Sequence, residues 1–411
     1  MKRNDPRYQA YVEILKEELI PAMGCTEPIA LAYAAAKARE VLGVLPDSVQ
    51  LQVSGSIIKN VKSVIVPNTG HLKGMEAAVA AGIIAGSAEK ELEVISEVSE
   101  EKKSAIRDYL QTVPITIEHT EQGHVFDIVV TERCGQDYAR VRIADYHTNI
   151  CRIEKNGTVL YEVPLLDETV QEDARADRSL LNMQDIWDFA ETADLRDVAD
   201  LLERQIRYNN AIAEEGLLGD YGANIGRVLL TTYGNDVSNR AKAKAAAGSD
   251  ARMNGCELPV IINSGSGNQG ITCSVPLIEY AKELHSGKEK LYRALIISNL
   301  VAIHEKTGIG TLSAYCGAVS AGAGAGAGIV YLCGDGYQAA IHTVVNALAI
   351  VSGIVCDGAK ASCAAKIASS VDAALLGYNM YKCNQEFKGG DGIVMKDIET
   401  TIKGIGRLGK D

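Results

Sequence analysis

The sequence predicts an α+β fold, in which a helical domain rich in Gly and Ala carries an inserted α/β sandwich domain of mostly antiparallel sheet. From about Ser48, apolar and polar residues alternate at the period-two spacing of half-buried strands, and after Pro164 helical spacing replaces this alternation. Of the 411 residues, 47% are hydrophobic, and a chain of this length usually forms two or three domains. The predicted divisions are an N-terminal helical segment at 1–45 that packs with the C-terminal domain, the sandwich domain at 46–165, and the helical domain at 166–411.

The N-terminal segment predicts two helices separated by a break. Residues 6–20 have helical spacing, with a proline near each end. Thr26 is a good capping residue for a second helix at about 28–42. Cys25 would then lie at the N-terminal end of that helix, where partial positive charge favours a thiolate.

The sandwich domain is predicted from a series of short alternating stretches. Strands are expected at 49–55, 61–66, 92–99, 115–122, 124–132, 138–150 and 151–162. Asn156-Gly157 is a strong hairpin signal within the last of them. Helices are expected at 74–85 and 100–111.

The C-terminal domain is predicted to be almost entirely helical. Helical patterns occupy 169–176, 184–192, 195–215, 236–248, 275–285, 289–305, 311–331, 336–353, 359–377 and 395–404. No internal repeat is evident in these patterns.

Charge and composition exclude several classes of partner. The net charge is −12, so nucleic acid and anionic membrane surfaces, which need basic patches, are not expected as partners. No segment reaches the ~20 strongly apolar residues of a membrane span. Ten cysteines without an apparent signal peptide indicate a reducing compartment, and we expect a cytoplasmic protein. The cysteines interpreted as core thiols are Cys134, Cys151, Cys256 and Cys383.

Three further cysteines lie in the most informative segment of the chain. On an uninterrupted helix, Cys356 and Cys363 would share a face but lie about 10 Å apart along the axis. Gly358 can break such a helix, and the Gly-rich surroundings of Cys316 allow close approach of the backbone. The spacing matches neither zinc knuckles nor ferredoxin runs, so spacing alone favours three core thiols over a metal site.

Motifs along almost the whole chain resemble those of the L-cysteine desulfidase family, which is related to the α chain of iron–sulfur L-serine dehydratases. In order they are MGCTEP (23–28), SGSIIKNVKSV (54–64), PNTG (67–70), YHTNI (146–150), SGSGNQGITCSVP (264–276), AYCGAVSAGAGAGAG (314–328) and CDGAKASCAAKIA (356–368). The desulfidase branch is the closer match because of MGCTEP and the short gap between the last two cysteines. One departure is Asn68, where many relatives have Gly, although Asn tolerates left-handed geometry.

The resemblance implies a [4Fe-4S] cluster in the helical domain, held by Cys316, Cys356 and Cys363, with one iron left open. It also implies a lyase that eliminates sulfide and ammonia from L-cysteine to give pyruvate, with the open iron acting as Lewis acid. Cys25 is the implied catalytic cysteine, either as the base that removes the α-proton or as a cap on the open iron. Lys360 either tunes the cluster electrostatically or is a solvated helix lysine.

Other residues in these motifs are candidates for substrate binding. Residues 265–270 fit G-x-G-x-x-G, but their helical surroundings disfavour a dinucleotide site. The segment is either a plain tight turn or a loop that binds the substrate carboxylate at a helix start, and the resemblance implies the substrate loop. The sandwich domain is expected to close over the cluster, since clefts between domains commonly bind small ligands. The candidates are Ser54, Lys59, Asn60, Asn68, His147, Thr148, Ser264, Ser266, Asn268 and Gln269.

Three alternatives compete with this function. Dehydration of L-serine on the same cluster is the nearest alternative. A pyridoxal-phosphate desulfhydrase would need a Schiff-base lysine, and we expect no pyridoxal phosphate. A non-catalytic iron–sulfur redox or iron sensor would need a DNA- or partner-binding module, which the sequence does not show. The expected partners are an amino-acid substrate and a second copy of the chain in a homodimer.

Overall fold

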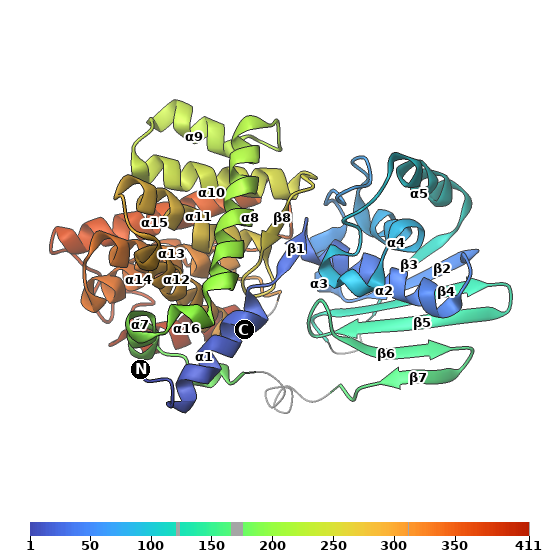
Figure 1. Cartoon of the computed structure of the whole chain (residues 1–411), viewed down its shortest axis with the longest axis horizontal. Helices are drawn as coiled ribbons and strands as arrows, with labels where there is room; N and C mark the ends of the chain where they lie inside the picture. Colours follow the sequence, from blue (N-terminus) through green and yellow to red (C-terminus); the bar gives the residue numbers. More distant parts are fainter. Residues whose placement is uncertain (121–123, 166–175, 311, 411) are drawn as a thin grey trace.

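The elements form two parts that lie side by side (Figure 1). The sheet part runs from α2 (Thr26–Leu42) to β7 (Thr158–Glu162), and the helical part contains α1 (Pro6–Glu18) and the elements from η3 (Arg178–Leu180) to α16 (Ile398–Lys410). The fold is therefore α+β, as predicted, with a sheet between two segments of a mostly helical chain. The computed structural model describes residues 1–120, 124–165, 176–310 and 312–410.

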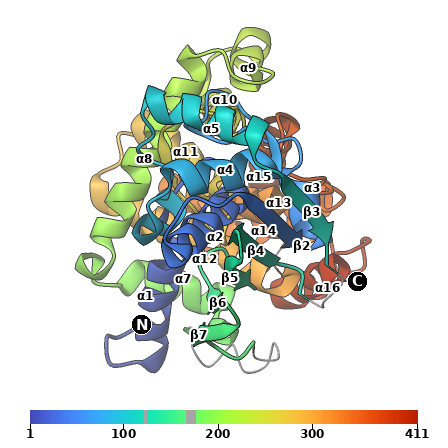
Figure 2. The ribbon, with the colours of Figure 1, turned by 90° about the vertical axis from the view of Figure 1, so that its right-hand side faces the viewer.

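Within the described residues the sheet has six strands in the spatial order β3-β2-β4-β5-β6-β7. β3 pairs in parallel with β2 and the other neighbours pair antiparallel, so the sheet is mixed and mostly antiparallel. Asn156 and Gly157 form the predicted hairpin turn, and both have positive φ. Figure 2 shows the sheet part facing the viewer, with α5 (Glu100–Thr112) above and β7 below. The other strands are β2 (Ser48–Val53), β3 (Ile115–His119), β4 (Asp127–Cys134), β5 (Asp137–Ala144) and β6 (Ile150–Lys155).

α2 packs against the sheet and against α4 (Gly74–Ala85). Its small alanines let α4 approach so closely that a Cβ on Gly82 would lie 2.1 Å from the carbonyl oxygen of Ala32. This placement differs from the expectation that the whole of residues 1–45 packs with the C-terminal domain. α1 lies in the helical part, but α2 is buried on nearly all sides within the sheet part.

Two predicted strands are wrong. Residues 61–66 follow the short helix α3 (Gly55–Val61), and only Ile65 forms an isolated bridge. Residues 92–99 contain the end of η1 (Ala88–Glu93) and turns. In both segments alternate apolar residues, such as Val64 and Val94, lie in loops or turns but have buried side chains. A period-two pattern therefore arose there without a strand.

The helical part surrounds the Gly- and Ala-rich helix α13, which contacts α11, α12, α14 and α15. A Cβ on Gly324 would lie 2.4 Å from the carbonyl oxygen of Ser298 in α12, and a Cβ on Gly328 would lie 2.5 Å from Leu277 in α11. These glycines therefore allow backbone-close packing. The elements are α7 (Met183–Thr192), η4 (Leu195–Asp197), α8 (Ala199–Leu218), α9 (Ile225–Tyr233), α10 (Val237–Met253), β8 (Pro259–Ile261), α11 (Gly267–Glu283), α12 (Lys288–Ile309), α13 (Gly317–Cys333), α14 (Tyr337–Val351) and α15 (Ser362–Lys382).

Most helical patterns correspond to observed helices, with two differences. α9 was not predicted, and α11 begins at Gly267, well before the expected start at 275, because its glycines and Pro276 obscured the helical spacing. The pattern predicted at 169–176 lies, apart from its last residue, outside the described residues. Across the described ranges, no helix has both the length and the apolar character needed to cross a membrane.

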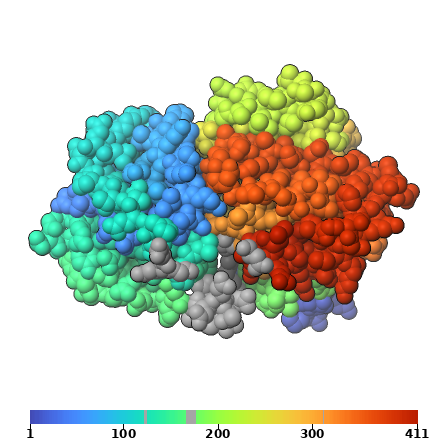
Figure 3. All heavy atoms as spheres, turned by 180° about the vertical axis from the view of Figure 1, so that it is seen from behind, coloured from blue at the N-terminus to red at the C-terminus, as the bar shows by residue number. Residues whose placement is uncertain are grey.

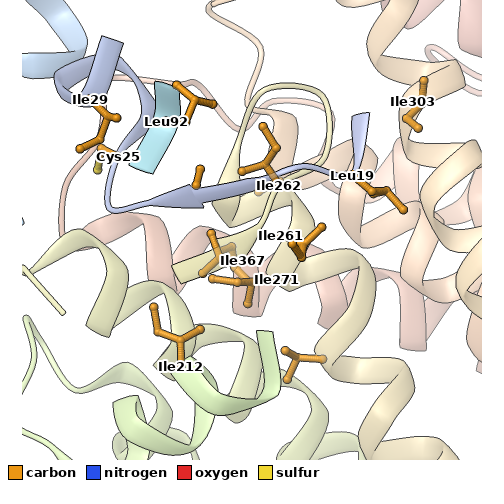
Figure 4. Packing of buried hydrophobic residues seen from close by; sticks show 14 of the residues in the cluster. Leu19, Cys25, Ile29, Leu92, Ile212, Ile261, Ile262, Ile271, Ile303 and Ile367 are labelled. Atoms are coloured by element: carbon orange, nitrogen blue, oxygen red, sulfur yellow. The ribbon is translucent and has the colours of Figure 1, made fainter. Parts of the chain in front are cut away.

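A short ribbon joins the two parts. β1 (Pro21–Met23) pairs antiparallel with β8, and the chain enters α2 directly afterwards. Figure 4 shows buried side chains around this ribbon, including Cys25 and Ile29 next to β1 and Ile261 and Ile271 on the helical side. Figure 3 shows, from behind, the blue surface of the sheet part directly against the orange surface of the helical part.

Candidate active site

Four helices begin at one cavity between the two parts, which we call the interface cavity. Its volume is about 120 Å³, and its wall includes the N-terminal residues of α2, α11, α13 and α15. None of these four helices has a side-chain hydrogen bond from its N-cap residue. Helix N-termini present unpaired N–H groups and partial positive charge, so the cavity is suited to anions. The residues from these starts are Cys25, Thr26, Glu27, Ser266, Asn268, Gln269, Cys316, Gly317, Ala318 and Cys363.

Two chain segments hold Cys316 and Cys356 next to each other. The N–H of Cys316 donates to the carbonyl of Ile354 at 3.1 Å, and the N–H of Cys356 donates to the carbonyl of Ala314 at 2.7 Å. These bonds flank a short antiparallel bridge between the two segments. Both cysteines therefore reach the interface cavity from a fixed backbone.

Gly358 turns the chain from Cys356 toward Cys363. Its φ of 98° is in the region that favours glycine, and a Cβ there would lie 2.4 Å from the carbonyl oxygen of Lys59 in the sheet part. Cys363 lies in the first turn of α15, as the helix-break argument predicted. Burial, together with the nearby Cys356 and Cys363 thiols, raises the pKa of Cys316 to about 11. This mutual effect shows that the three thiols share one electrostatic environment.

Cys25 lies in the opposite wall, at the N-cap of α2, and only 1% of its surface is exposed. Its sulfur lies 3.7 Å from the sulfur of Met253. Burial raises the pKa of Cys25 to about 12, although Arg252 acts in the opposite direction. The helix-end argument predicted a thiolate, and here the cost of burying a charge outweighs the helix end.

Three charged residues of the wall were missed in the sequence. They are Glu27, Arg252 and Lys306. Burial lowers the pKa of Lys306 to about 8, although the Cys356 and Cys316 thiols oppose this shift. Glu27 belongs to the MGCTEP motif and could have been selected from it. Arg252 and Lys306 lie in ordinary helical patterns, which carry no such signal.

Buried polar atoms without a hydrogen-bond partner gather around the interface cavity. Such atoms are uncommon in folded proteins, because an unpaired buried donor or acceptor costs about 1–3 kcal/mol. Their presence in one wall indicates that a bound ligand supplies the missing partners. They are Asn60 Oδ1, His147 Nε2, Arg252 Nε, Gln269 Oε1 and Tyr315 Oη.

The sheet part contributes Asn60 and His147 to this wall. Asn60, from α3, donates to Glu27 Oε1 at 2.9 Å. His147 lies in the turn after β5, and burial lowers its pKa, which favours the neutral imidazole. The loop at 264–269 belongs to the helical part but contacts α2, because the Thr26 hydroxyl donates to the carbonyl of Gly265 at 3.0 Å.

Five predicted site residues do not line the interface cavity. Ser54 Oγ donates to the carbonyl of Val125, and the Asn68 side chain donates to the carbonyl of Ile95, so both hold loops in place. Asn68 does adopt the expected left-handed conformation, with φ of 58°. Family-like motifs contain structural residues as well as site residues, and sequence does not separate them. The other three predicted residues outside the interface cavity are Lys59, Thr148 and Lys360. Thr148 lines a neighbouring cavity of about 550 Å³, and Lys360 forms an ion pair with Asp357 at 3.2 Å.

The G-x-G-x-x-G segment has packing roles at each glycine. A Cβ on Gly265 would lie 3.2 Å from the His147 ring, one on Gly267 would lie 2.2 Å from Arg252 Nε, and one on Gly270 would lie 2.0 Å from the carbonyl of Ile261. The preceding strand β8 pairs antiparallel with β1, which is not the βαβ unit of a dinucleotide site. The loop instead lies at the start of α11, as predicted.

Comparison with known proteins identifies relatives along the whole chain. The serine dehydratase alpha chain family model matches residues 89–411. A UPF0597 protein of Desulfitobacterium hafniense is 62% identical over 410 residues, covering 100% of this chain and 95% of the relative. UPF0597 proteins of Lachnoclostridium phytofermentans and Treponema denticola are 53% and 47% identical, covering 98% and 99% of this chain and 96% and 95% of the relatives. The chain therefore belongs to the UPF0597 family and contains a serine dehydratase alpha chain domain.

Proposed function

We propose that this protein is an iron–sulfur lyase that eliminates sulfide and ammonia from L-cysteine to give pyruvate. The observation that carries the proposal is the meeting of three cysteines and four helix N-termini at one cavity. The serine dehydratase alpha chain domain supports the class of reaction, and the motif resemblance supports L-cysteine as the substrate.

The wall of the interface cavity fits an anionic cluster. In the described part of the chain, no three His, Cys, Asp or Glu side chains converge closely enough for a single metal ion. A polynuclear cluster binds each thiolate at a different iron, so its ligands surround it instead of meeting at a point. Cys316, Cys356 and Cys363 would hold the [4Fe-4S] cluster, with Lys306 and Lys366 near them as compensating cations.

Helix N-termini would stabilise the same group. In the first turn of α13, the N–H of Ala318 lies beside Cys316 and can donate to thiolate sulfur. At the start of α15, the N–H groups of Cys363 and Ala364 already donate to the carbonyls of Lys360 and Ala361. When bound, the cluster supplies an iron with an open position, a soft Lewis acid that takes up the charge of a thiolate leaving group.

The protein's own residues would bind the amino acid and move its proton. The loop at 264–269 and the start of α11 offer N–H donors to a carboxylate, and Asn60 and His147 approach from the sheet part. Cys25 is the proposed proton-transfer group at the α-carbon, and its second proposed role is to cap the open iron at rest. Both roles need the thiolate, which burial disfavours by raising the pKa of Cys25 and which the nearby Arg252 favours. Both roles require Cys25 for turnover and leave cluster anchoring to the other three cysteines.

L-Serine dehydration in the same cavity is the second candidate, favoured by the serine dehydratase alpha chain domain. The two candidates differ in the leaving group, sulfide or water, and share the cluster and the binding groups.

Anaerobic purification followed by assays tests both candidates. We expect iron and acid-labile sulfide in equal amounts, and release of pyruvate and sulfide from L-cysteine with a higher kcat/KM than pyruvate release from L-serine. A higher kcat/KM for L-serine would favour the dehydratase. Absence of iron, or of pyruvate from both amino acids, would contradict the proposed function.

A further inference from the structure

Arg252 is a buried arginine without an acidic partner. It lies in the last turn of α10, and only 4% of its surface is exposed. Its one hydrogen bond runs from Nη1 to Asn268 Oδ1 at 3.2 Å, and its Nε has no acceptor. Among the described residues, no carboxylate lies within 4.0 Å of its guanidinium, whereas the partly buried Arg178 pairs with Glu18 at 2.6 Å. Because buried charges are normally paired, an anionic ligand is the missing partner of Arg252.

The guanidinium lies where a carboxylate would also meet a helix N-terminus. A Cβ on Gly267, the first residue of α11, would lie 2.2 Å from Arg252 Nε, so the guanidinium rests directly against this turn. Arg252 also acts electrostatically on Cys25 and Cys363, both of which line the interface cavity. Guanidinium and helix N–H groups together form a strong carboxylate site.

A fixed negative charge lies elsewhere in the same wall. Glu27 supplies the one carboxylate among the described residues that line the interface cavity. One of its oxygens accepts a hydrogen bond from Asn60 Nδ2 at 2.9 Å, which holds its position. The other lies 3.2 Å from the Thr26 hydroxyl oxygen, whose single proton is shared with the carbonyl of Gly265. Glu27 and Arg252 form no ion pair with each other, so neither charge neutralises the other directly.

We propose that Arg252 binds the α-carboxylate and Glu27 the α-ammonium group of a free α-amino acid. Separate fixed charges of opposite sign match a zwitterion and reject molecules that lack either charge, such as peptides joined through the α-carboxyl and amino-acid amides. The proposal deepens the proposed function, on which its link to turnover rests, but binding itself can be measured without turnover. The competing explanation is that Arg252 only compensates the charge of a bound cluster.

L-Alanine is a suitable probe because it carries both α-charges and no β-leaving group. Its binding, and that of L-alaninamide, would be measured by titration calorimetry with anaerobically purified protein and the variants Arg252→Gln, Arg252→Lys and Glu27→Gln. We expect Arg252→Gln to weaken L-alanine binding by about 10²-fold, as for removal of one partner of a buried charge pair. Binding of L-alaninamide, which lacks the carboxylate charge, should be weak throughout and change little. Arg252→Lys should recover part of the affinity.

Iron content and visible absorbance separate substrate binding from cluster compensation. Both Arg252 variants should keep their iron, and the KM for L-cysteine should rise more than kcat falls. Arg240→Gln is a matched control on the same helix, because Arg240 pairs with Glu283 on the outer surface. Equal affinity of wild type and Arg252→Gln for L-alanine, no binding of L-alanine to wild type, or loss of iron in both Arg252 variants would overturn the assignment. Arg252-dependent binding of L-alanine without turnover of cysteine or serine would support this assignment and contradict the proposed lyase.

Discussion

The ten cysteines divide into two sets that differ in their position relative to the helix starts at the interface cavity. In the first set, Cys25 and Cys316 are N-cap residues and Cys363 lies in a first turn, all at the interface cavity with Cys356. The second set lies in strands, loops, helix interiors and C-terminal ends of helices. Its members are Cys134, Cys151, Cys256, Cys273, Cys333 and Cys383.

Acidity does not separate the two sets. Burial raises the pKa of Cys151 to about 11, the same direction and extent as for Cys316. What differs is the surrounding backbone, because helix N-termini offer N–H donors and partial positive charge to any anionic sulfur. For Cys25, Cys316 and Cys363, the comparison therefore predicts that function follows position at a helix start and not burial or pKa. Cys356 lies between α14 and α15 and is held beside Cys316 by its backbone hydrogen bond to Ala314.

The largest expected effect comes from the three proposed ligands. Changing Cys316, Cys356 or Cys363 singly to Ser should remove the visible absorbance of the cluster and abolish turnover, because each thiolate anchors a separate iron. Cys383→Ser, at the exposed C-terminal end of α15, is the matched control and should keep both. If all three ligand variants retain iron and full activity, the division between the two sets has no functional meaning.

Cys25 should show a smaller effect of a different kind. Cys25→Ala should retain iron and lose about 10²- to 10⁴-fold in kcat, which is typical for loss of a proton-transfer group. Iron analysis of anaerobically purified protein, together with pyruvate release, measures both quantities. Loss of iron from this variant would make Cys25 a structural ligand, and normal turnover would move it to the second set.

Asn60 tests the contribution of the sheet part. Its hydrogen bond to Glu27 and its unpartnered oxygen in the wall both point to substrate positioning. Asn60→Ala should lower kcat/KM about 10- to 10²-fold, since hydrogen bonds to charged groups contribute about 1.5–3 kcal/mol. Gln50→Ala, on β2 of the same part, is the control. Unchanged kcat/KM in Asn60→Ala would contradict a role of Asn60 in substrate positioning.

The smallest effect on activity is expected for Cys273, which is completely buried inside α11 and belongs to the second set. Cys273→Ala should keep iron and turnover, and should lower the free energy of unfolding by about 1 kcal/mol, within the usual range for single substitutions. Guanidinium denaturation measures the stability change. A large loss of activity with intact folding would show that the second set also contributes to the site.

Much of the fold was predictable because long periodic segments determine their own element type. The helices at α1, α4 and α5 and the strands β4 to β7 follow directly from hydrophobic spacing. The wrong predictions concern segments whose structure is determined by tertiary contacts and not by the local hydrophobic pattern. Val64 and Val94 are buried from loops and imitate strands, and α2 is too uniformly apolar for its spacing to reveal which part it joins.

Residues of the candidate site could be predicted only where they belong to a motif shared with the family that the sequence resembles. Motif membership selected Asn60, His147 and Gln269, which line the interface cavity, and also Ser54 and Asn68, which hold loops. Side-chain direction depends on tertiary packing, which a single sequence does not contain. Arg252 is a site residue that no motif contains. In the sequence nothing distinguishes it from a surface arginine, and only the packing of α11 against it reveals its position.

The order in which the ribosome releases the chain adds a constraint of timing. The wall of the interface cavity extends from Cys25 to Ile367, so its first residues emerge early and its last only when most of the protein has been made. Domains generally fold as units during synthesis, starting from the N-terminus, but here the opposite walls belong to the two ends of the chain. The complete wall for a group held in this cavity therefore exists only when nearly the whole chain has been made.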